Sequence, residues 1–499
     1  MSNETKIWPI FRWANGWLSD DLFTWVANSF YFSNDMEVRL DAKSIYPCKK
    51  PAYTDDATKF TLDTSSNSLE IRAVLKTTLW WVIFTRRDIY YKSPTAFQKK
   101  ATMSEDICDA EIFDWFIYIT TLTKIYYLKD YDNTDLHWED MANSTDSDEP
   151  NRWRLSTSLT SNKFHPLYAS TTVLAIWDTN KVWKINKETK YTVQEWFNLQ
   201  EWYYVRFLDE LWWYIRATSV SATFGNSEVL LWDKVGKAVT ETIPLLWYVV
   251  LQSCIYEWYH YLLTNKWLGL LNWYQYYLLK KAETDVNSDT RNGMCVFDDK
   301  LYFIANDWIY IYWAKNKNYN EVLALWHKVE EWYALWAIAA DWNEIVITRN
   351  RVSSSNPAVV WFWYANSKQW EVQTMCYYWT SMSEIKQCLY MRLWYNIPTK
   401  TIWGTKHSWN IKVYYRTEAD AINDNIDNWE WHEMTQEWWL TAESNMRSPF
   451  ATTIKLNLRF QWIQFKFVLT NCIYTEWWTE KTKDTNLYSA DLYYDLMLE

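Results

Sequence analysis

Seven stretches of this chain repeat one short pattern, and the repetition restricts the possible folds more than any other feature. Each stretch has a run of alternating aromatic and β-branched residues, a short turn and a second such run. Six of them start near residues 82, 116, 173, 259, 301 and 344, and the stretch 201–219 fills the widest gap. A recurrence of about forty residues with about four strands per unit is typical of β-propeller blades. Because one blade cannot cover its own faces, successive blades must stack around an axis.

The strand pattern predicts an all-β chain in three parts. An extended docking segment is expected at 1–70, followed at 71–395 by a six- or seven-bladed β-propeller. Residues 396–499 have a different sequence pattern, which predicts an antiparallel β-sandwich. The best helical candidate, residues 318–332, is also compatible with two strands around a turn.

One segment of the predicted sandwich alternates strictly. RFQWIQFKFVL (459–469) offers Phe460, Trp462, Phe465 and Phe467 for burial and reads as a central strand.

The turns between these strands carry tryptophan where hairpins favour glycine. Trp115, Trp308 and Trp342 follow an aspartate, and Trp273 and Trp429 follow an asparagine, each before or inside a strand-like run. Asp-Gly and Asn-Gly are strong hairpin signals because glycine supplies the positive φ of the turn. We therefore expect Trp308 and Trp342 at tight turns, exposed, with positive φ at some of these sites.

The amino-acid counts agree with this interpretation. The chain has 6 glycines and 40 tryptophans, whereas average glycine usage is roughly 7%. We hypothesise that most of these tryptophans are glycine in the native protein, because some bacterial lineages and their phages decode UGA as glycine. Four tryptophans lie within strand patterns and are expected to be authentic: Trp183, Trp232, Trp431 and Trp462. The other interpretation is a truly tryptophan-rich protein that binds carbohydrate or a membrane surface.

Charge and hydropathy exclude several classes of protein. Fifty basic against 61 acidic residues give a net charge of −11, which argues against nucleic acid as the main ligand. No run of about eighteen apolar residues occurs, so no membrane span is predicted. The start of the chain, MSNETKIWPIFRW, lacks the apolar core of a secretory signal.

No catalytic constellation is present, so we expect a non-enzyme with no catalytic, cofactor-binding or metal-binding residues. GxSxG, P-loop, HExxH and GxGxxG motifs are all absent. The cysteines are odd in number, form no CxxC motif and are expected to be free buried thiols: 48, 108, 254, 295, 376, 388 and 472. The histidines are dispersed and are interpreted as lone strand or surface residues: 137, 165, 260, 327, 407 and 432.

A few weaker candidates have ordinary explanations. NDNIDNW (423–429) is rich in oxygen ligands but lacks calcium-loop spacing, so a hairpin is favoured. The pairs Asp20–Asp21 and Asp298–Asp299 read as solvated turns, since neighbours in a strand point to opposite faces. The dipeptides Trp177–Asp178 and Trp232–Asp233 lack the upstream Gly-His of a WD repeat, and the first favours Gly-Asp.

Both ends of the chain resemble a known class of virion protein. With glycine at 13, 17 and 25, residues 11–47 resemble the opening of tail-associated structural proteins of tailed phages, in which a Gly-Gly-(Ile/Leu)-(Ser/Ala)-Asp-Asp run precedes a propeller. Residues 410–434 and 459–469 resemble the terminal β-sandwich of similar proteins. The resemblance implies a structural tail or head–tail component without catalysis, located in the virion after synthesis in the host cytoplasm. Its partners would be other virion proteins, in homo- or hetero-oligomers, with possible contact to a host surface glycan.

Two other interpretations stay open. A glycan-binding or glycan-cleaving propeller of a bacterial or viral surface would place two or three carboxylates, with exposed aromatics, at one mouth of the central channel. A cellular propeller scaffold that binds other proteins would lie outside any cluster of virion genes.

Overall fold

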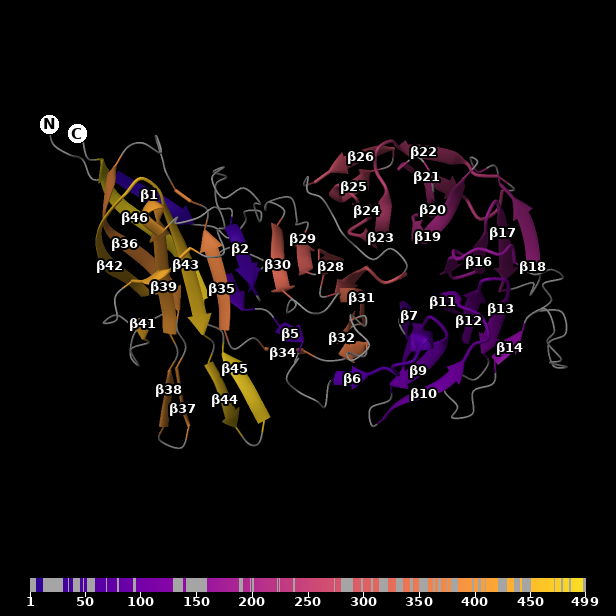
Figure 1. Cartoon of the computed structure of the whole chain (residues 1–499), viewed down its shortest axis with the longest axis horizontal. Coiled ribbons are helices and arrows are strands. Elements are labelled where there is room, and N and C mark those ends of the chain that lie inside the picture. The colour runs from indigo at the N-terminus through magenta and orange to yellow at the C-terminus, as the bar shows by residue number, and fades with distance from the viewer. Residues whose placement is uncertain are drawn as a thin grey trace. The chain divides into compact units, whose positions relative to one another are not determined.

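The computed structural model is all-β in the part of the chain that it describes (Figure 1). It describes residues 6–11, 30–34, 36–38, 45–47, 49–51, 59–68, 70–78, 80–92, 96–128, 138–140, 159–187, 192–197, 199, 202–221, 223, 225–236, 238–272, 274–279, 290–297, 299–306, 308–313, 322–328, 335–341, 344–349, 358–361, 364–366, 369–374, 376–377, 385–396, 399–402, 405–408, 410–420, 429–434, 440–441, 450–470, 472–476, 479–483 and 486–496. Two short 3-10 turns, η1 (Ser66–Ser68) and η2 (Glu418–Asp420), are the helical elements of these residues.

Seven four-stranded antiparallel sheets form the blades of a β-propeller. The first blade consists of β7 (Ile71–Lys76), β8 (Trp81–Thr85), β9 (Asp88–Lys92) and β10 (Phe97–Thr102). The second consists of β11 (Ile107–Phe113), β12 (Phe116–Thr121), β13 (Ile125–Leu128) and β14 (Trp138–Asp140). The third consists of β15 (Leu167–Ala169), β16 (Val173–Asp178), β17 (Lys181–Asn186) and β18 (Thr192–Trp196).

The fourth to sixth blades follow in the same order along the chain. The fourth blade consists of β19 (Tyr203–Leu211), β20 (Tyr214–Ser221), β21 (Ser227–Trp232) and β22 (Glu241–Leu245). The fifth consists of β23 (Val250–Tyr256), β24 (Tyr259–Thr264), β25 (Trp267–Asn272) and β26 (Gln275–Leu278). The sixth consists of β27 (Met294–Phe297), β28 (Lys300–Ala305), β29 (Trp308–Trp313) and β30 (Val322–Lys328).

The seventh blade closes the ring with a strand from the other end of the propeller. It consists of β31 (Leu335–Ala340), β32 (Ile345–Arg349), β33 (Val359–Trp361) and β6 (Lys59–Thr61). Phe60 pairs with Val360, and the Phe60 ring stacks on Phe97 of the first blade at 4.9 Å. The first strands contact one another in sequence from β7 to β31, and β31 contacts β7. The propeller therefore has seven blades, within the expected range of six or seven.

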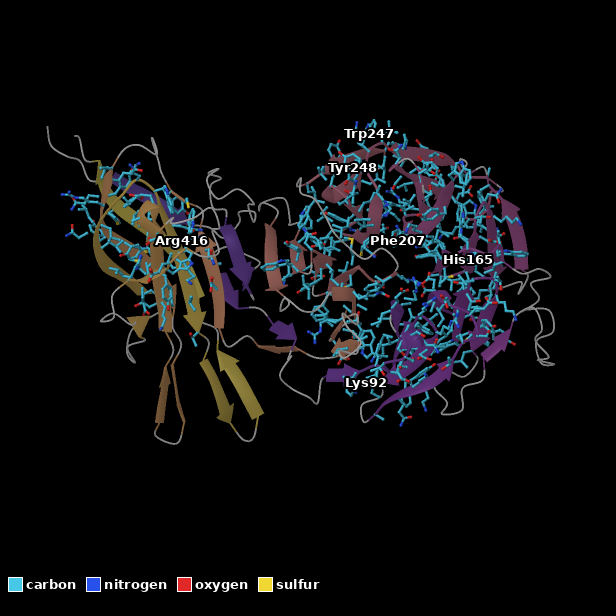
Figure 2. The ribbon with its side chains drawn as sticks, viewed as in Figure 1. Lys92, His165, Phe207, Trp247, Tyr248 and Arg416 are labelled. Carbon is cyan, nitrogen blue, oxygen red and sulfur yellow. The ribbon has the colours of Figure 1, made fainter. Side chains whose placement is uncertain are left out.

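The hydrophobic core lies between neighbouring blades, as stacking requires. One cluster joins Val82 and Ile117 of the first two blades, and another joins Ile71 to Val346 across the closure. Phe207 belongs to the cluster between the fourth and fifth blades (Figure 2). The second strands β8, β12 and β16 are buried along their whole length, which explains their near-continuous apolar sequence.

The second part of the fold contains two six-stranded antiparallel sheets. One has the order β3 (Met36–Val38), β4 (Ile45–Pro47), β46 (Asn486–Leu496), β36 (Lys386–Asn396) and β42 (Phe450–Phe460), with β1 (Lys6–Phe11) beside β46. The other has β2 (Phe30–Asn34), β35 (Gln369–Thr374), β43 (Ile463–Thr470), β39 (Asn410–Thr417) and β40 (His432–Glu433), with β41 (Leu440–Thr441) beside β39. That these two sheets form a β-sandwich stays a prediction.

Three two-stranded ribbons complete the described strands. They are β5 (Lys49–Pro51) with β34 (Tyr364–Asn366), β37 (Thr399–Ile402) with β38 (Thr405–Ser408), and β44 (Cys472–Glu476) with β45 (Thr479–Lys483).

The division of the chain differs from the expected segments 1–70, 71–395 and 396–499. One compact unit comprises Ala52–Asp307 and Val329–Trp363, and the other Met1–Pro51, Trp308–Lys328 and Tyr364–Glu499. Strands from the first fifty residues hydrogen-bond to β46 and β35, so they complete sheets rather than form a separate segment. Pairing across long sequence separations leaves no local signal, which is why the pattern missed it.

Two local expectations need correction. The helical candidate 318–332 contains β30, a strand that pairs with β29 in the sixth blade. RFQWIQFKFVL is not one strand: β42 ends at Phe460 in one sheet, and after a bend at 461–462 β43 begins at Ile463 in the other sheet. Its second half is nonetheless central, paired with β35 and β39, and Phe460, Trp462, Phe465 and Phe467 are all buried.

Candidate functional site

Acidic residues gather on the inner strands of two blades. Asp109 and Glu111 lie on β11, two residues apart and hence on one face of the strand, and Asp209 and Glu210 lie on β19. Asp109 is 5% exposed. These carboxylates, with Arg291, Ser253 and His260, are called the axial cluster below.

A short segment before β27 binds to several blades at once. The Arg291 amide donates to the carbonyl of Arg72 at 2.9 Å, and the Val74 amide donates to Asn292 Oδ1 at 2.8 Å, both in the first blade. The Ile338 amide of the seventh blade donates to the Asn292 carbonyl at 2.6 Å. Residues 290–293, the axial segment, thus connect blades that are distant in sequence.

Gln252 of the fifth blade holds the other end of the axial segment. Its Nε2 donates to the Thr290 carbonyl at 3.0 Å, and its Oε1 accepts the Gly293 amide at 3.0 Å. A Cβ at 293 would lie 2.2 Å from Gln252 Cδ. Glycine is required at 293 because a larger residue would force these two groups apart.

Arg291 binds the carboxylates of the second blade. Its Nη1 donates to the Ala110 carbonyl at 2.8 Å and lies 3.6 Å from Asp109 Oδ1, and its Nη2 pairs with Glu111. Burial opposes the charge of Arg291, but Glu111 and Asp109 raise its pKa above the ordinary value. Arg291 therefore neutralises charge that would otherwise be uncompensated in the interior.

Asp109 is strongly affected by its surroundings. Burial raises its pKa to about 6, against the opposing effects of Arg291 and of the Leu167 amide. The Leu167 amide donates to Oδ2 at 2.7 Å and the Ala110 amide to Oδ1 at 2.8 Å. Burial also raises the pKa of Tyr168, with Glu210 and Asp209 adding to the effect, so its hydroxyl stays protonated.

Ser253, His260 and Asp209 have the composition of a nucleophilic triad but not its geometry. Ser253 Oγ lies 2.9 Å from His260 Nε2 and donates to Asp209, while His260 Nε2 lies 3.4 Å from Asp209. In a working triad the two imidazole nitrogens contact the serine and the carboxylate separately. Here both contacts use Nε2, Nδ1 has no hydrogen-bond partner, and His260 is fully buried. The trio is a structural network.

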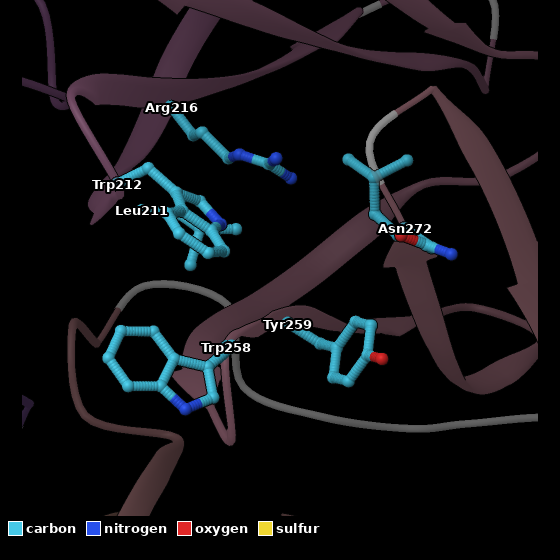
Figure 3. Close-up of a pocket in the computed structure, with 7 residues that line it drawn as sticks. Leu211, Trp212, Arg216, Trp258, Tyr259 and Asn272 are labelled. Atoms are coloured by element: carbon cyan, nitrogen blue, oxygen red, sulfur yellow. The ribbon is translucent and has the colours of Figure 1, made fainter.

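A small surface pocket lies beside the hairpins β19–β20 and β23–β24 (Figure 3). Its volume is about 120 Å³, and its lining residues are Leu211, Trp212, Arg216, Trp258, Tyr259, Leu271 and Asn272. Arg216 is 1% exposed, and its Nε and Nη1 have no hydrogen-bond partner. Burial lowers the Arg216 pKa, although Asp209 opposes this effect. The indoles of Trp212 and Trp258 lie 5.7 Å apart at the pocket mouth.

Most residues singled out from sequence lie apart from one another. His165 is buried between the carbonyls of Trp177 and Leu122, at 3.3 and 3.2 Å, and His432 lies 2.6 Å from Asp420 in the other unit. Asp299 occupies the turn between β27 and β28. Among the described residues no group of histidine, cysteine, aspartate and glutamate could hold a metal ion, and no helix is long and apolar enough to cross a membrane.

Five cysteines are free thiols: Cys108, Cys254, Cys295, Cys376 and Cys388. Burial raises the pKa of each, that of Cys108 to about 12. Asp20–Asp21, Asp298, Trp342, His137 and most of NDNIDNW lie outside the described residues.

The axial cluster was not recognised from sequence. The only local signals were Asp-Ala-Glu at 109–111 and Asp-Glu at 209–210 within strand runs. Arg291 and Gln252 carry no motif, because the partners of Arg291 are up to 219 residues away in the chain.

Comparisons with known proteins concern the fold. No family model matches the chain, and no curated protein matches it. Among solved structures it is similar to an inactive variant of virginiamycin B lyase from Staphylococcus aureus, with quinupristin (TM-score 0.44, 7% identity, 60% of this chain and 98% of that one). It is also similar to the Neurospora crassa Pan2 WD40 domain (TM-score 0.41, 8% identity, 65% and 97%).

Proposed function

We propose that this protein is a structural component of a tailed-phage virion, in the tail or the head–tail region, and acts by assembling with other virion proteins. The resemblance of its terminal segments supports the virion assignment. The observation that supports a non-catalytic role is that the axial carboxylates are already paired with other side chains. Each has a structural partner: Arg291 for Asp109 and Glu111, Ser253 for Asp209, and Lys234 for Glu210 at 2.5 Å.

Acid–base cleavage of a glycoside needs one carboxyl group as a proton donor and a second that is free to act on water or sugar. Carboxylates that share one arginine, or that accept from a half-buried serine, serve to join blades. A rigid ring with variable loops then provides surfaces for neighbours, and burial of such surfaces is how virion parts hold together.

Quantitative mass spectrometry of purified particles tests the assignment. We expect this chain at a fixed ratio to the capsid proteins and enriched over the soluble fraction of infected cells. Absence from particles that contain the other tail proteins would refute it.

The glycan-binding alternative is favoured by the pocket at Arg216. A buried guanidinium beside two exposed indoles is suited to a sugar that carries a carboxylate. Titration of the full chain with uronic-acid and sialic-acid oligosaccharides tests it, with R216M as the matched variant. Saturable binding that R216M abolishes would support this alternative, and no binding to either acid would remove it. In this alternative the sugar would stack on the indoles of residues 212 and 258, so it requires that both residues are tryptophan.

A further inference from the structure

Five tryptophans occupy a backbone conformation that suits glycine. They have φ values between 61° and 69°: Trp115, Trp202, Trp212, Trp247 and Trp258. For a bulky side chain a positive φ is a genuine outlier, because Cβ crowds the following carbonyl oxygen. The same five indoles are between 49% and 78% exposed, so packing does not offset the cost of the conformation. Trp247 lies at the outer edge of the propeller (Figure 2).

Three of these residues lie in two-residue hairpin loops whose φ patterns demand glycine. Asp114 and Trp115, with φ of 49° and 68°, connect β11 to β12, and Glu257 and Trp258, with 48° and 68°, connect β23 to β24. Two positive φ values in succession are the pattern of a type I′ turn, which favours Asn-Gly and Asp-Gly. Trp212, with φ 61°, opens the loop between β19 and β20, the position where a type II′ turn takes glycine.

Tryptophan is over-represented among such residues. In the described part of the chain thirteen non-glycine residues have positive φ, and six of them are tryptophan. Forty tryptophans in 499 residues would account for about one. Four of the other seven are aspartate or asparagine, which tolerate this region. The sixth tryptophan, Trp267, has φ 98° and a buried indole, so it is left outside the set of five.

A second class of tryptophan is buried within strands. Trp177, Trp183 and Trp232 lie within strands and are 5% exposed or less. Trp177 Nε1 donates to the Thr179 carbonyl at 2.7 Å, and Trp232 Nε1 donates to the Gly236 carbonyl at 2.9 Å. Authentic tryptophan was expected at 183 and 232. Glycine was expected at 177, but the buried indole places Trp177 in this class. Trp308 was expected to be exposed at a tight turn, but it is the first residue of β29, is half-buried and is not among the residues with positive φ.

We propose that residues 115, 202, 212, 247 and 258 are glycine in the native protein, whereas 177, 183 and 232 are tryptophan. One cause accounts for the whole set: UGA codons that the native host reads as glycine. The proposal does not depend on the virion assignment, because it concerns turn geometry alone. It bears directly on the glycan alternative, since glycine at 212 and 258 removes both indoles from the pocket of Arg216.

The codons at the eight positions test the assignment directly. We expect UGA at the five turn positions and UGG at 177, 183 and 232, together with peptides from the natural source that carry glycine at the five sites. UGG codons at the five turn positions, or tryptophan in those peptides, would overturn it.

Stability measurements test the physical premise independently. In the full chain, W115G and W258G should each raise the folding equilibrium constant about 5- to 30-fold, the equivalent of the cost of one left-handed residue. W115A and W258A are the matched controls: they remove the indole but keep Cβ, and so should gain little. W177G should instead lower the constant sharply. Equal gains for glycine and alanine, or a loss with glycine at both sites, would refute the premise.

Discussion

Replacing Asp109 by asparagine should change how the stability of the propeller depends on pH. In the folded chain the pKa of Asp109 rises from 3.8 to about 6 because the carboxyl group is buried. The folded state therefore binds a proton more tightly than the unfolded chain does. Between about pH 4 and 6 the free energy of unfolding must fall as the pH rises, because the folded state gives up a proton that the unfolded chain has already lost. Asparagine does not titrate, so D109N lacks this contribution.

The size of the effect follows from the pKa difference. About two pH units, at 1.36 kcal/mol per unit, correspond to ~3 kcal/mol. The unfolded carboxyl group is already more than half ionised at pH 4, so only part of this difference is gained above that pH. The free energy of unfolding of D109N, relative to that of the wild type, should therefore rise by about 2 kcal/mol as the pH increases from 4 to 7. Urea unfolding at several pH values, followed by the fluorescence of the buried tryptophans, gives the free energy of unfolding of D109N and of the wild type as a function of pH. The difference between these two curves is the quantity to compare.

Asp106 provides a matched control with the opposite sign. Burial works against its charge, but Arg87 and Arg86, at 2.6 and 2.7 Å, lower its pKa. The stabilisation that ionised Asp106 gives is present above its unfolded pKa and is lost as the pH falls. The free energy of unfolding of D106N, relative to that of the wild type, should therefore decrease as the pH rises. Two results would refute the assignment of Asp109 as a buried carboxyl group with a raised pKa. One is a difference in unfolding free energy between D109N and the wild type that does not change with pH. The other is a difference that changes with pH in the same direction as that of D106N.

Three further outcomes are expected. R291M should cost about 3–5 kcal/mol because it leaves Asp109 and Glu111 without their cation, and a chemical-denaturation loss below ~1 kcal/mol would contradict the role given to Arg291. F60A should cost about 2 kcal/mol, half the value of a fully buried phenylalanine. Hydrogen exchange should then accelerate in β33 but not in β12, whereas equal acceleration in both would argue against a local closure. Finally, the thiols of Cys108, Cys254, Cys295, Cys376 and Cys388 should react with a disulfide reagent far more slowly than in the urea-unfolded chain, since burial raises their pKa values. Equal rates in the folded and unfolded chains would show that these thiols are accessible.

Local periodicity was sufficient to predict the blades. The expected strand starts at 82, 116, 173, 259, 301 and 344 fall in or next to β8, β12, β16, β24, β28 and β32, and the stretch 201–219 covers most of β20. All seven are the second strands of their sheets. These strands are buried on both faces, so their apolar runs are the longest and the easiest to recognise.

Contacts between distant residues could not be predicted in the same way. β6 has only three residues, in a stretch that reads as polar, and its role depends on Val359–Trp361. The axial segment likewise depends on a backbone that approaches Gln252 closely at Gly293, and on an arginine whose partners lie in another blade. Such features follow from closure of the ring, which no short window of sequence contains.

The position of β6 also determines when the propeller can be completed during synthesis. Residue 59 leaves the ribosome about 300 residues before its partner Trp361, an interval of roughly 15 to 60 s at cellular rates of translation. During that time β6 has no partner, and the apolar face of the first blade that packs against the seventh is uncovered, which exposes the nascent chain to association with other copies. Ring closure is therefore a late step in biogenesis, and chains that terminate before residue 359 are expected to aggregate.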